Sequence, residues 1–311
     1  MVWPIRRLGP IGSLLLTNAR SRRWLNRTYE RLGARSASVF NLLFDGVNPP
    51  VDFVWECEVG GKEFSMPVHW AMPRTWNAAR VWRWSGNRYV RQFYELLLKE
   101  RQPGILWDVG ANDGTHTYPF AAHGFDCLCF EPQPTCAEYI LEVAKLNGFE
   151  RIAVIPCAVT ERDDEEYRFY VSESTWYSSL SKRNVERFEP AHDTLVKSVT
   201  LDSVALKHGL KPTMVKIDVE GAEWPVIQGA RAVISEGRPD IILEIYRSAP
   251  ERPAVWELLR TLDYDFVTIG VDAKRPFQRL LTLDDFVRFP SSDVALLPRS
   301  SFSTRFPPYR A

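Results

Sequence analysis

A glycine-containing turn carries the most informative residues of the sequence. The turn DVGANDG, Asp108–Gly114, follows the short apolar run Ile105–Val109. A glycine directly after a buried strand lets a ligand approach the backbone, and free N–H groups at the next helix start favour a carboxylate or phosphate. Asn112 and Thr115 stand where a dinucleotide-binding G-x-G-x-x-G needs its next glycines, and no P-loop Gly-Lys-Ser/Thr is present. The turn indicates a ligand site of another kind, unless it is a plain strand-to-helix connection.

An acidic residue ends the next apolar run of the chain. Glu131 follows Phe125–Phe130 and stands 23 positions after Asp108. A carboxylate at the end of a strand can accept two hydrogen bonds from ribose hydroxyls. The alternative is a surface glutamate in front of Pro132. Taken with the glycine turn, Glu131 indicates a ligand with a ribose and a zwitterionic or anionic tail.

Three carboxylates gather at the end of a later apolar run. The segment KIDVEGAE contains Asp218, Glu220 and Glu223, and Glu244 lies in the following run. Clustered carboxylates raise one another's pKa, which suits a general base, and they can also hold a divalent cation. The alternative is helix capping, since Glu220 and Glu223 are favourable in the first turn of a helix that follows Gly221.

Short apolar runs alternate with helical periodicity from about residue 89 onward. This order predicts βαβ units and a doubly wound, mostly parallel α/β sheet, in which ligands bind beyond the carboxyl ends of the strands. Residues 53–68 predict a β-hairpin that turns at Gly60-Gly61. The expected strands of the sheet are Ile105–Val109, Phe125–Phe130, Ile152–Val159, Met214–Val219, Asp240–Tyr246, Phe266–Gly270 and Asp293–Leu297, with shorter ones at Tyr167–Val171 and Ser198–Leu201. The expected helices are Tyr89–Lys99, Thr115–His123, Thr135–Asn147 with a stop at Gly148, Trp224–Ile234 and Ala254–Leu262.

Composition places the chain among globular proteins. Of 311 residues 45% are hydrophobic and 25% charged, and the formal net charge is zero, so electrostatics give no reason to expect nucleic-acid binding. The five cysteines are an odd number without CxxC spacing, which argues against a disulfide framework or a structural zinc site and favours a reducing, cytoplasmic location. No apolar run reaches the roughly 18–20 residues that span a bilayer, and secretion is not expected.

The beginning of the chain is basic and rich in tryptophan. Residues 1–50 contain eight arginines, no lysine and two acidic residues. This block suits contact with an anionic lipid or polyphosphate surface, has the look of an organelle transit peptide, and is equally a solvated helical extension. Trp70, Trp76, Trp82 and Trp84 follow it. They can stack on sugars or form a lid, but packing of an N-terminal cap is the preferred interpretation.

The ordered motifs resemble the FkbM family of S-adenosylmethionine-dependent methyltransferases. The resemblance implies a class I, Rossmann-like sheet of seven strands with the last antiparallel, and O-methylation of a hydroxyl on a sugar, glycan or natural product. It divides the chain into an N-terminal extension or cap, 1–85, and a methyltransferase domain, 86–311. The matching segments are ILWDVGANDGTHT at Ile105–Thr117, FEPQP at Phe130–Pro134, Asn147–Val159, VTLDS at Val199–Ser203 and VKIDVEGAEWPVIQGA at Val215–Ala230.

Carried onto this chain, the resemblance implies a set of residues around S-adenosyl-L-methionine. Glu131 would bind the ribose hydroxyls, and Asp218 would sit near the transferring methyl group. The methionine and ribose end would lie along the turn that contains Asp108, Gly110, Asn112, Asp113 and Gly114, and the adenine beside Pro132, Cys157 and Ala158.

The cofactor's sulfonium already activates the methyl group, so the protein must align the acceptor and take up a proton. We expect Asp218 to be the base, then Glu220 or Glu223, and His116 only after these. In the segment STWYSSL, Ser174–Leu180, three side chains could bind acceptor hydroxyls, or the segment could be an ordinary polar loop. The substrate candidates are Tyr177, Ser178, Ser179 and Glu244.

Three alternatives share parts of this pattern. A nicotinamide-dependent oxidoreductase would share the ribose carboxylate, but the missing glycines count against it. A non-catalytic protein could keep the fold, although intact Asp108, Glu131 and Asp218 argue against decay. A magnesium ion could bind at Asp218, Glu220 and Glu244, although no dedicated metal site is predicted.

Overall fold

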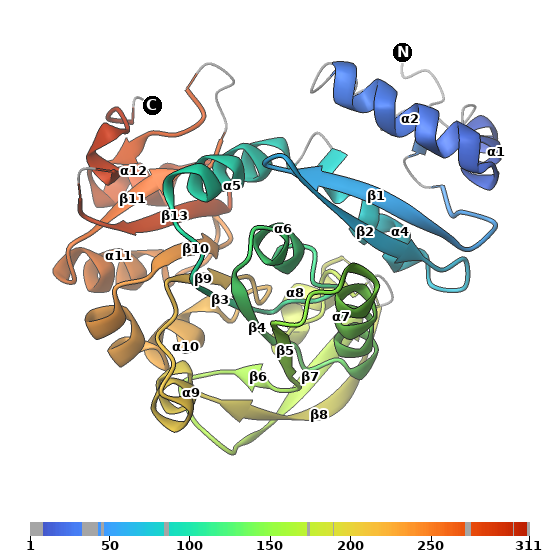
Figure 1. Cartoon of the computed structure of the whole chain (residues 1–311). Coiled ribbons are helices and arrows are strands. Elements are labelled where there is room, and N and C mark those ends of the chain that lie inside the picture. The colour runs from blue at the N-terminus through green and yellow to red at the C-terminus, as the bar shows by residue number, and fades with distance from the viewer. Residues whose placement is uncertain are drawn as a thin grey trace, which may run out of the picture.

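A twisted eight-stranded sheet forms the centre of the protein (Figure 1). The computed structural model describes residues 9–32, 43–44, 47–83, 87–172, 175–188, 190–270, 275–300 and 302–309, so Trp84, Ser174 and the 85/86 boundary lie outside the described residues. The strand order is β12-β11-β13-β10-β9-β3-β4-β5. The bounds are β3 Ile105–Val109, β4 Asp126–Phe130, β5 Ile152–Ile155, β9 Met214–Ile217, β10 Asp240–Glu244, β11 Tyr264–Thr268, β12 Arg279–Leu280 and β13 Asp293–Pro298.

The sheet is parallel from β5 to β10, and β13 is antiparallel to both of its neighbours, β10 and β11. This confirms the predicted doubly wound, mostly parallel sheet whose last long strand is antiparallel. Seven strands were expected and the sheet has eight. The additional strand is β12, which pairs with β11 at Phe266 and Val267 and forms the edge of the sheet. A two-residue strand carries no periodicity by which the sequence could reveal it.

The strand expected at Ile152–Val159 is interrupted. Pro156 stands between β5 and β6, Ala158–Val159, and β6 belongs to a separate three-stranded sheet of order β6-β8-β7. Proline has no N–H to donate to a ladder, so it ends the pairing of β5. In the small sheet β7 is Glu166–Ser172 and β8 is Ala191–Val199. Leu201, expected in a strand, instead begins helix α9, which Thr200 caps by accepting a hydrogen bond from the Ser203 N–H at 3.0 Å.

Helices cover both faces of the central sheet (Figure 1). On one face α6 and α7 share a core with strand residues such as Leu106 and Met214, and on the other α9, α10 and α11 pack on residues such as Trp107 and Val215. Helix α7 begins at Pro134, one residue before the predicted start, and ends at Gly148 in the left-handed conformation, as predicted. The helix bounds are α5 Arg88–Glu100, α6 Thr117–Ala122, α7 Pro134–Asn147, α8 Lys182–Glu186, α9 Leu201–His208, α10 Glu223–Gln228, α11 Arg252–Thr261 and α12 Leu283–Arg288. The helix expected at Trp224–Ile234 ends early and is followed by a π-helical turn, Val233–Gly237.

The N-terminal residues add an outer layer above α6 and α7 (Figure 1). The predicted hairpin is confirmed, with β1 at Phe53–Val59 paired antiparallel to β2 at Lys62–Val68. Trp76 and Trp82 are buried in a core shared with α5, α6 and α7, which agrees with the packing interpretation, whereas Trp70 is exposed. This core contains residues from both sides of position 85. The division of the chain at 85/86 stays a prediction. This layer contains the helices α1 Gly9–Thr17, α2 Ala19–Leu32 and α4 Pro73–Arg80, and the 3-10 turn η3 Val81–Arg83.

Within the described ranges, no helix combines the length and the apolar character needed to cross a membrane.

Candidate active site

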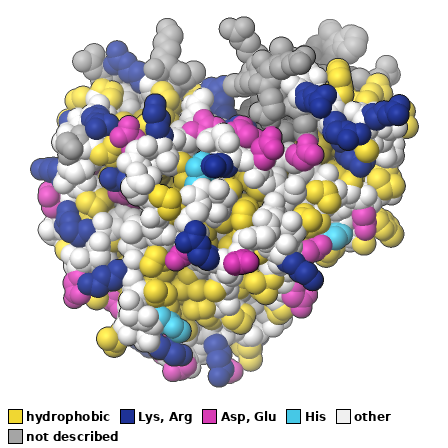
Figure 2. All heavy atoms as spheres, in the orientation of Figure 1, with side chains coloured by type: hydrophobic (Ala, Val, Ile, Leu, Met, Phe, Trp, Pro, Cys, Tyr) yellow, Lys and Arg dark blue, Asp and Glu magenta, His cyan; other side chains and the backbone are white. Residues whose placement is uncertain are grey.

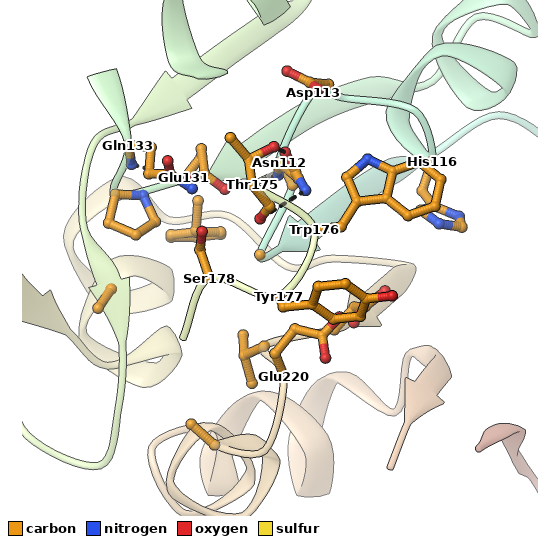
Figure 3. A pocket seen from close by; sticks show the side chains of 18 of the residues that line it. Asn112, Asp113, His116, Glu131, Gln133, Thr175, Trp176, Tyr177, Ser178 and Glu220 are labelled. Atoms are coloured by element: carbon orange, nitrogen blue, oxygen red, sulfur yellow. Dashed lines mark hydrogen bonds between the residues drawn. The ribbon is translucent and has the colours of Figure 1, made fainter. Parts of the chain in front are cut away.

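A cavity of about 290 Å³ opens at the carboxyl ends of β3, β4, β9 and β10 (Figure 3). This is the edge at which the strand order predicts a ligand. Most of the sequence-predicted site residues line it. They are Gly110, Asn112, Asp113, His116, Glu131, Pro132, Cys157, Ala158, Tyr177, Ser178, Asp218, Glu220 and Glu244.

The floor of the cavity depends on Gly110. Its N–H and that of Ala111 both donate to the Phe130 carbonyl, at 3.0 and 3.2 Å, which ties the turn to the end of β4. Gly110 has a φ of +77°, and a Cβ at this position would overlap the carbonyl oxygen of Asp218. Only glycine therefore lets the ends of β3 and β9 come this close.

Glu131 joins the turn to the strand beside it. Its two carboxylate oxygens accept hydrogen bonds from the backbone N–H groups of Asn112 at 2.7 Å and Gln133 at 2.8 Å. The side chain is buried, and burial raises its pKa to about 7, although these two hydrogen bonds oppose the rise. Each oxygen keeps a further lone pair for a ligand hydroxyl. The two elements that the sequence paired are thus in contact.

Two predicted cofactor residues support the cavity from behind. Asp108 is buried beneath the turn, where it accepts a hydrogen bond from the Thr117 hydroxyl at 2.5 Å, and burial raises its pKa to about 6. A Cβ on Gly114 would overlap the hydroxyl of Tyr118, which donates to the Asp113 carbonyl at 2.7 Å. Neither Asp108 nor Gly114 lines the cavity, so each shapes the loop that does.

The N-terminal layer reaches the same loop through an arginine. Arg74 of α4 forms an ion pair with Asp113, and both side chains are buried. Its guanidinium also donates to the Thr135 carbonyl at 2.9 Å and lies 5.6 Å from the centre of the Tyr139 ring. Sequence reasoning missed Arg74, since it belongs to no motif and stands 39 positions before Asp113.

One end of the cavity is apolar. Pro132, Cys157 and Ala158 line it together with Phe130 and Val159. Burial raises the pKa of the Cys157 thiol to about 12, so the sulfur is neutral near pH 7. A flat heteroaromatic group suits such a surface.

The opposite end contains the carboxylates. The Lys216 ammonium, which is buried, donates to Asp218 at 3.2 Å. Burial alone would raise the pKa of Asp218, but electrostatic interactions with Lys216 and His116, together with hydrogen bonds from Glu244 and Lys216, hold that pKa below its usual range. The charge of Asp218, followed by burial, raises the pKa of Glu244 well above its usual range. The pKa values of the two neighbouring acids are therefore shifted in opposite directions.

Glu220 also lines this end of the cavity. Burial, followed by the charge of Asp218, raises its pKa to about 8, and the Tyr246 hydroxyl donates a hydrogen bond to it. His116 lines the cavity as well, with Nδ1 hydrogen-bonded to the Tyr94 hydroxyl at 2.7 Å. Burial lowers its pKa to about 3, so the imidazole is neutral.

Two further predicted residues act on the backbone. Glu223 accepts a hydrogen bond from the Gly221 N–H at 2.7 Å, and Ser179 donates to the Glu220 carbonyl at 2.9 Å. Neither side chain lines the cavity. Glu223 thus fits the capping interpretation better than that of a base, and Ser179 holds the Glu220 turn.

A loop after β7 crosses the cavity (Figure 3). Thr175 donates to the Asn112 side-chain oxygen at 2.9 Å, and the Asn112 amide donates back to the Thr175 carbonyl at 3.3 Å. Trp176 and Tyr177 follow and line the cavity, and the Tyr177 ring stacks on Phe188 with centres 4.4 Å apart. The sequence singled out the segment that contains Thr175 and Trp176 but named neither as a site residue, because only the folded chain brings this loop to the glycine turn. Gln133 was not named either, although it stands in the matching segment FEPQP.

In the part of the chain that the structure describes, no group of three or more His, Cys, Asp or Glu side chains is arranged to hold a metal ion. At the carboxylate end, the buried Lys216 ammonium provides a positive charge beside Asp218.

Comparison with known proteins gives a consistent assignment. The sequence profile of the methyltransferase FkbM domain matches residues 108–266. Hexuronic acid methyltransferase AglP of Haloferax volcanii is 27% identical over 165 residues, which cover 48% of this chain and 59% of that protein. The match therefore spans less than two thirds of the relative's length.

Two solved structures are similar at low identity. Methyltransferase FkbM from Methylobacillus flagellatus has a TM-score of 0.41 and 18% identity, covering 63% of this chain and 44% of that one. The SAM-dependent methyltransferase from Agrobacterium tumefaciens has a TM-score of 0.39 and 12% identity, covering 79% of this chain and 70% of that one.

Proposed function

This chain belongs to the FkbM methyltransferase family, and we propose that it transfers a methyl group from S-adenosylmethionine to a hydroxyl of a sugar, glycan or natural product. The observation that carries the proposal is the contact between the Gly110 turn and the buried carboxylate of Glu131. A bare strand-to-helix turn needs no such carboxylate. A ribose with two adjacent hydroxyls gives it a partner.

The residues of the cavity fit this donor. Glu131 would bind the ribose hydroxyls, and the backbone of the Gly110 turn would bind the amino-acid end. Pro132, Cys157 and Ala158 offer an apolar surface to the adenine. The bound donor supplies a methyl group already activated by a sulfonium, so the protein need only align the acceptor and receive a proton.

Asp218 is the proposed proton acceptor. Its pKa lies below the usual range, so it is ionised at neutral pH, it lines the cavity, and side-chain hydrogen bonds with Lys216 and Glu244 fix its orientation. A low pKa makes a weak base, yet an oxygen that has gained a methyl group is a strong acid and readily passes its proton to a carboxylate. Glu220, with a pKa near 8, is the second candidate, since it is partly ionised at neutral pH.

The charge of the lining limits the acceptor. Asp218, Glu220 and Glu244 line the acceptor end, and none of the described lining residues is an arginine or lysine. A carboxylate on the reacting sugar would lie among these acidic side chains, and the buried cation Lys216 is already paired with Asp218. We therefore favour a neutral hydroxyl compound over a hexuronic acid, the substrate class in the name of the Haloferax volcanii relative.

Two measurements test the proposal. Calorimetry measures the binding of S-adenosylhomocysteine, and an activity assay compares the rates of methylation of matched neutral and acidic sugars. We expect saturable binding of the homocysteine compound, loss of affinity in Glu131→Ala, and faster turnover of the neutral member of each pair. Binding of a nicotinamide dinucleotide in its place would refute the donor assignment. Donor binding without methylation of any acceptor would favour the non-catalytic alternative.

A further inference from the structure

The two N-terminal helices present a face that nothing in the proposed reaction uses. Helices α1 and α2 form the outermost layer next to the β1–β2 hairpin (Figure 1). Their residues 9–32 include five arginines and one glutamate. Figure 2 shows arginine side chains gathered at the edge of the molecule where these helices lie.

The inner side of this layer is firmly attached. Leu16 and Leu25 are buried in the core shared with the hairpin. Arg22 donates to the Leu16 carbonyl at 2.5 Å, and its guanidinium lies 4.7 Å from the centre of the Phe53 ring. These contacts fix which side of α2 faces outward.

The outer side combines positive charge with apolar side chains. Arg20, Arg23, Trp24 and Arg27 have helical spacing i, i+3, i+4 and i+7, and all four are exposed, Trp24 to 59%. Helix α1 adds Ile11 at 49% and Leu14 at 71% exposure. Exposure of a tryptophan and a leucine to water is unfavourable, so their presence beside three exposed arginines indicates a binding surface.

We propose that this outer face of α1 and α2 docks on the surface of an anionic lipid bilayer. Arginine side chains reach the phosphates while their stems cover acyl chains, and tryptophan settles at the boundary between headgroups and hydrocarbon. A nucleic acid would leave Ile11 and Leu14 facing water. A second copy of the same face would bring arginines against arginines.

Co-sedimentation of the full chain with vesicles tests this docking. We expect binding to mixed phosphatidylcholine–phosphatidylglycerol vesicles, no binding to phosphatidylcholine alone, and weakening with salt. An arginine near an anionic membrane contributes about 1 kcal/mol, so each Arg→Gln change at Arg20, Arg23 and Arg27 should lower the partition coefficient about fivefold. Trp24→Ala should lower it as well.

The matched control removes three exposed positive charges elsewhere. Lys197, Lys207 and Arg231 belong to or lie near β8, α9 and α10, on the side of the molecule away from α1 and α2 (Figure 1). Changing all three to Gln should leave vesicle binding unchanged. Equal loss in this control, retained binding in the triple arginine variant, or binding to RNA but not to anionic vesicles would overturn the proposal. Circular dichroism melting verifies that every variant is folded.

Discussion

The buried ion pair between Arg74 and Asp113 links the N-terminal layer to the turn Asp108–Gly114, and breaking it should destabilise the protein strongly. The change Arg74→Met removes the cation and the donor to the Thr135 carbonyl, while the methionine side chain fills much of the same volume. Asp113 would then be a buried carboxylate without a countercharge. Loss of one partner of a buried pair costs about 3–5 kcal/mol. Urea unfolding should show this decrease in the free energy of unfolding.

A double variant separates the charge from the packing. Arg74→Met with Asp113→Asn removes both charges, and hydrophobic or neutral replacement of a buried pair is often close to neutral. We expect it to recover most of the lost free energy of unfolding.

The control is Arg168→Met, which breaks an exposed ion pair with Asp193 at 2.7 Å and should cost under about 1 kcal/mol. If Arg74→Met costs no more than this control, or if the double variant is as unstable as the single one, the reasoning about the buried pair is wrong.

The remaining predictions concern single carboxylates of the cavity. Glu131→Ala should weaken S-adenosylhomocysteine binding by about 1–3 kcal/mol, and unchanged affinity in calorimetry would remove its ribose role. Asp218→Asn should lower the methyl-transfer rate on the order of 10²–10⁴-fold with donor affinity retained, and a normal rate would exclude Asp218 as the base. Burial raises the pKa of Glu220 from 4.5 to about 8, so its contribution to stability is complete below pH 4.5 and is lost as the pH rises through 8. The free energy of unfolding of Glu220→Gln should therefore fall less steeply with rising pH than that of the parent protein. Parallel curves of this free energy against pH would contradict the raised pKa of Glu220.

The sequence predicted the sheet well because its signals are local. Buried parallel strands are continuously apolar, so β3 and β9 were found within two residues of their observed ends. Boundaries failed where a local breaker was overlooked, as at Pro156, or where an element was too short for any period, as at β12.

The sequence brought the proposed site residues to one edge of the sheet, but it did not tell which of them line the cavity. The Gly110 turn, Glu131 and Asp218 share one edge because parallel strands end on the same side of a sheet. Sequence spacing cannot tell whether a side chain faces the cavity or lies behind it, so Asp108, Gly114, Glu223 and Ser179 were all placed in the lining. Arg74 and Thr175 contact the turn Asp108–Gly114 only through tertiary packing.

The carboxylate of Glu131 provides the most direct test of the account. A crystal structure with S-adenosylhomocysteine should place both ribose hydroxyls within hydrogen-bond distance of this side chain, with the sulfur directed toward Asp218. A ribose bound elsewhere in the cavity, or a Glu131 that contacts only the backbone amides of Asn112 and Gln133, would contradict the proposed donor site.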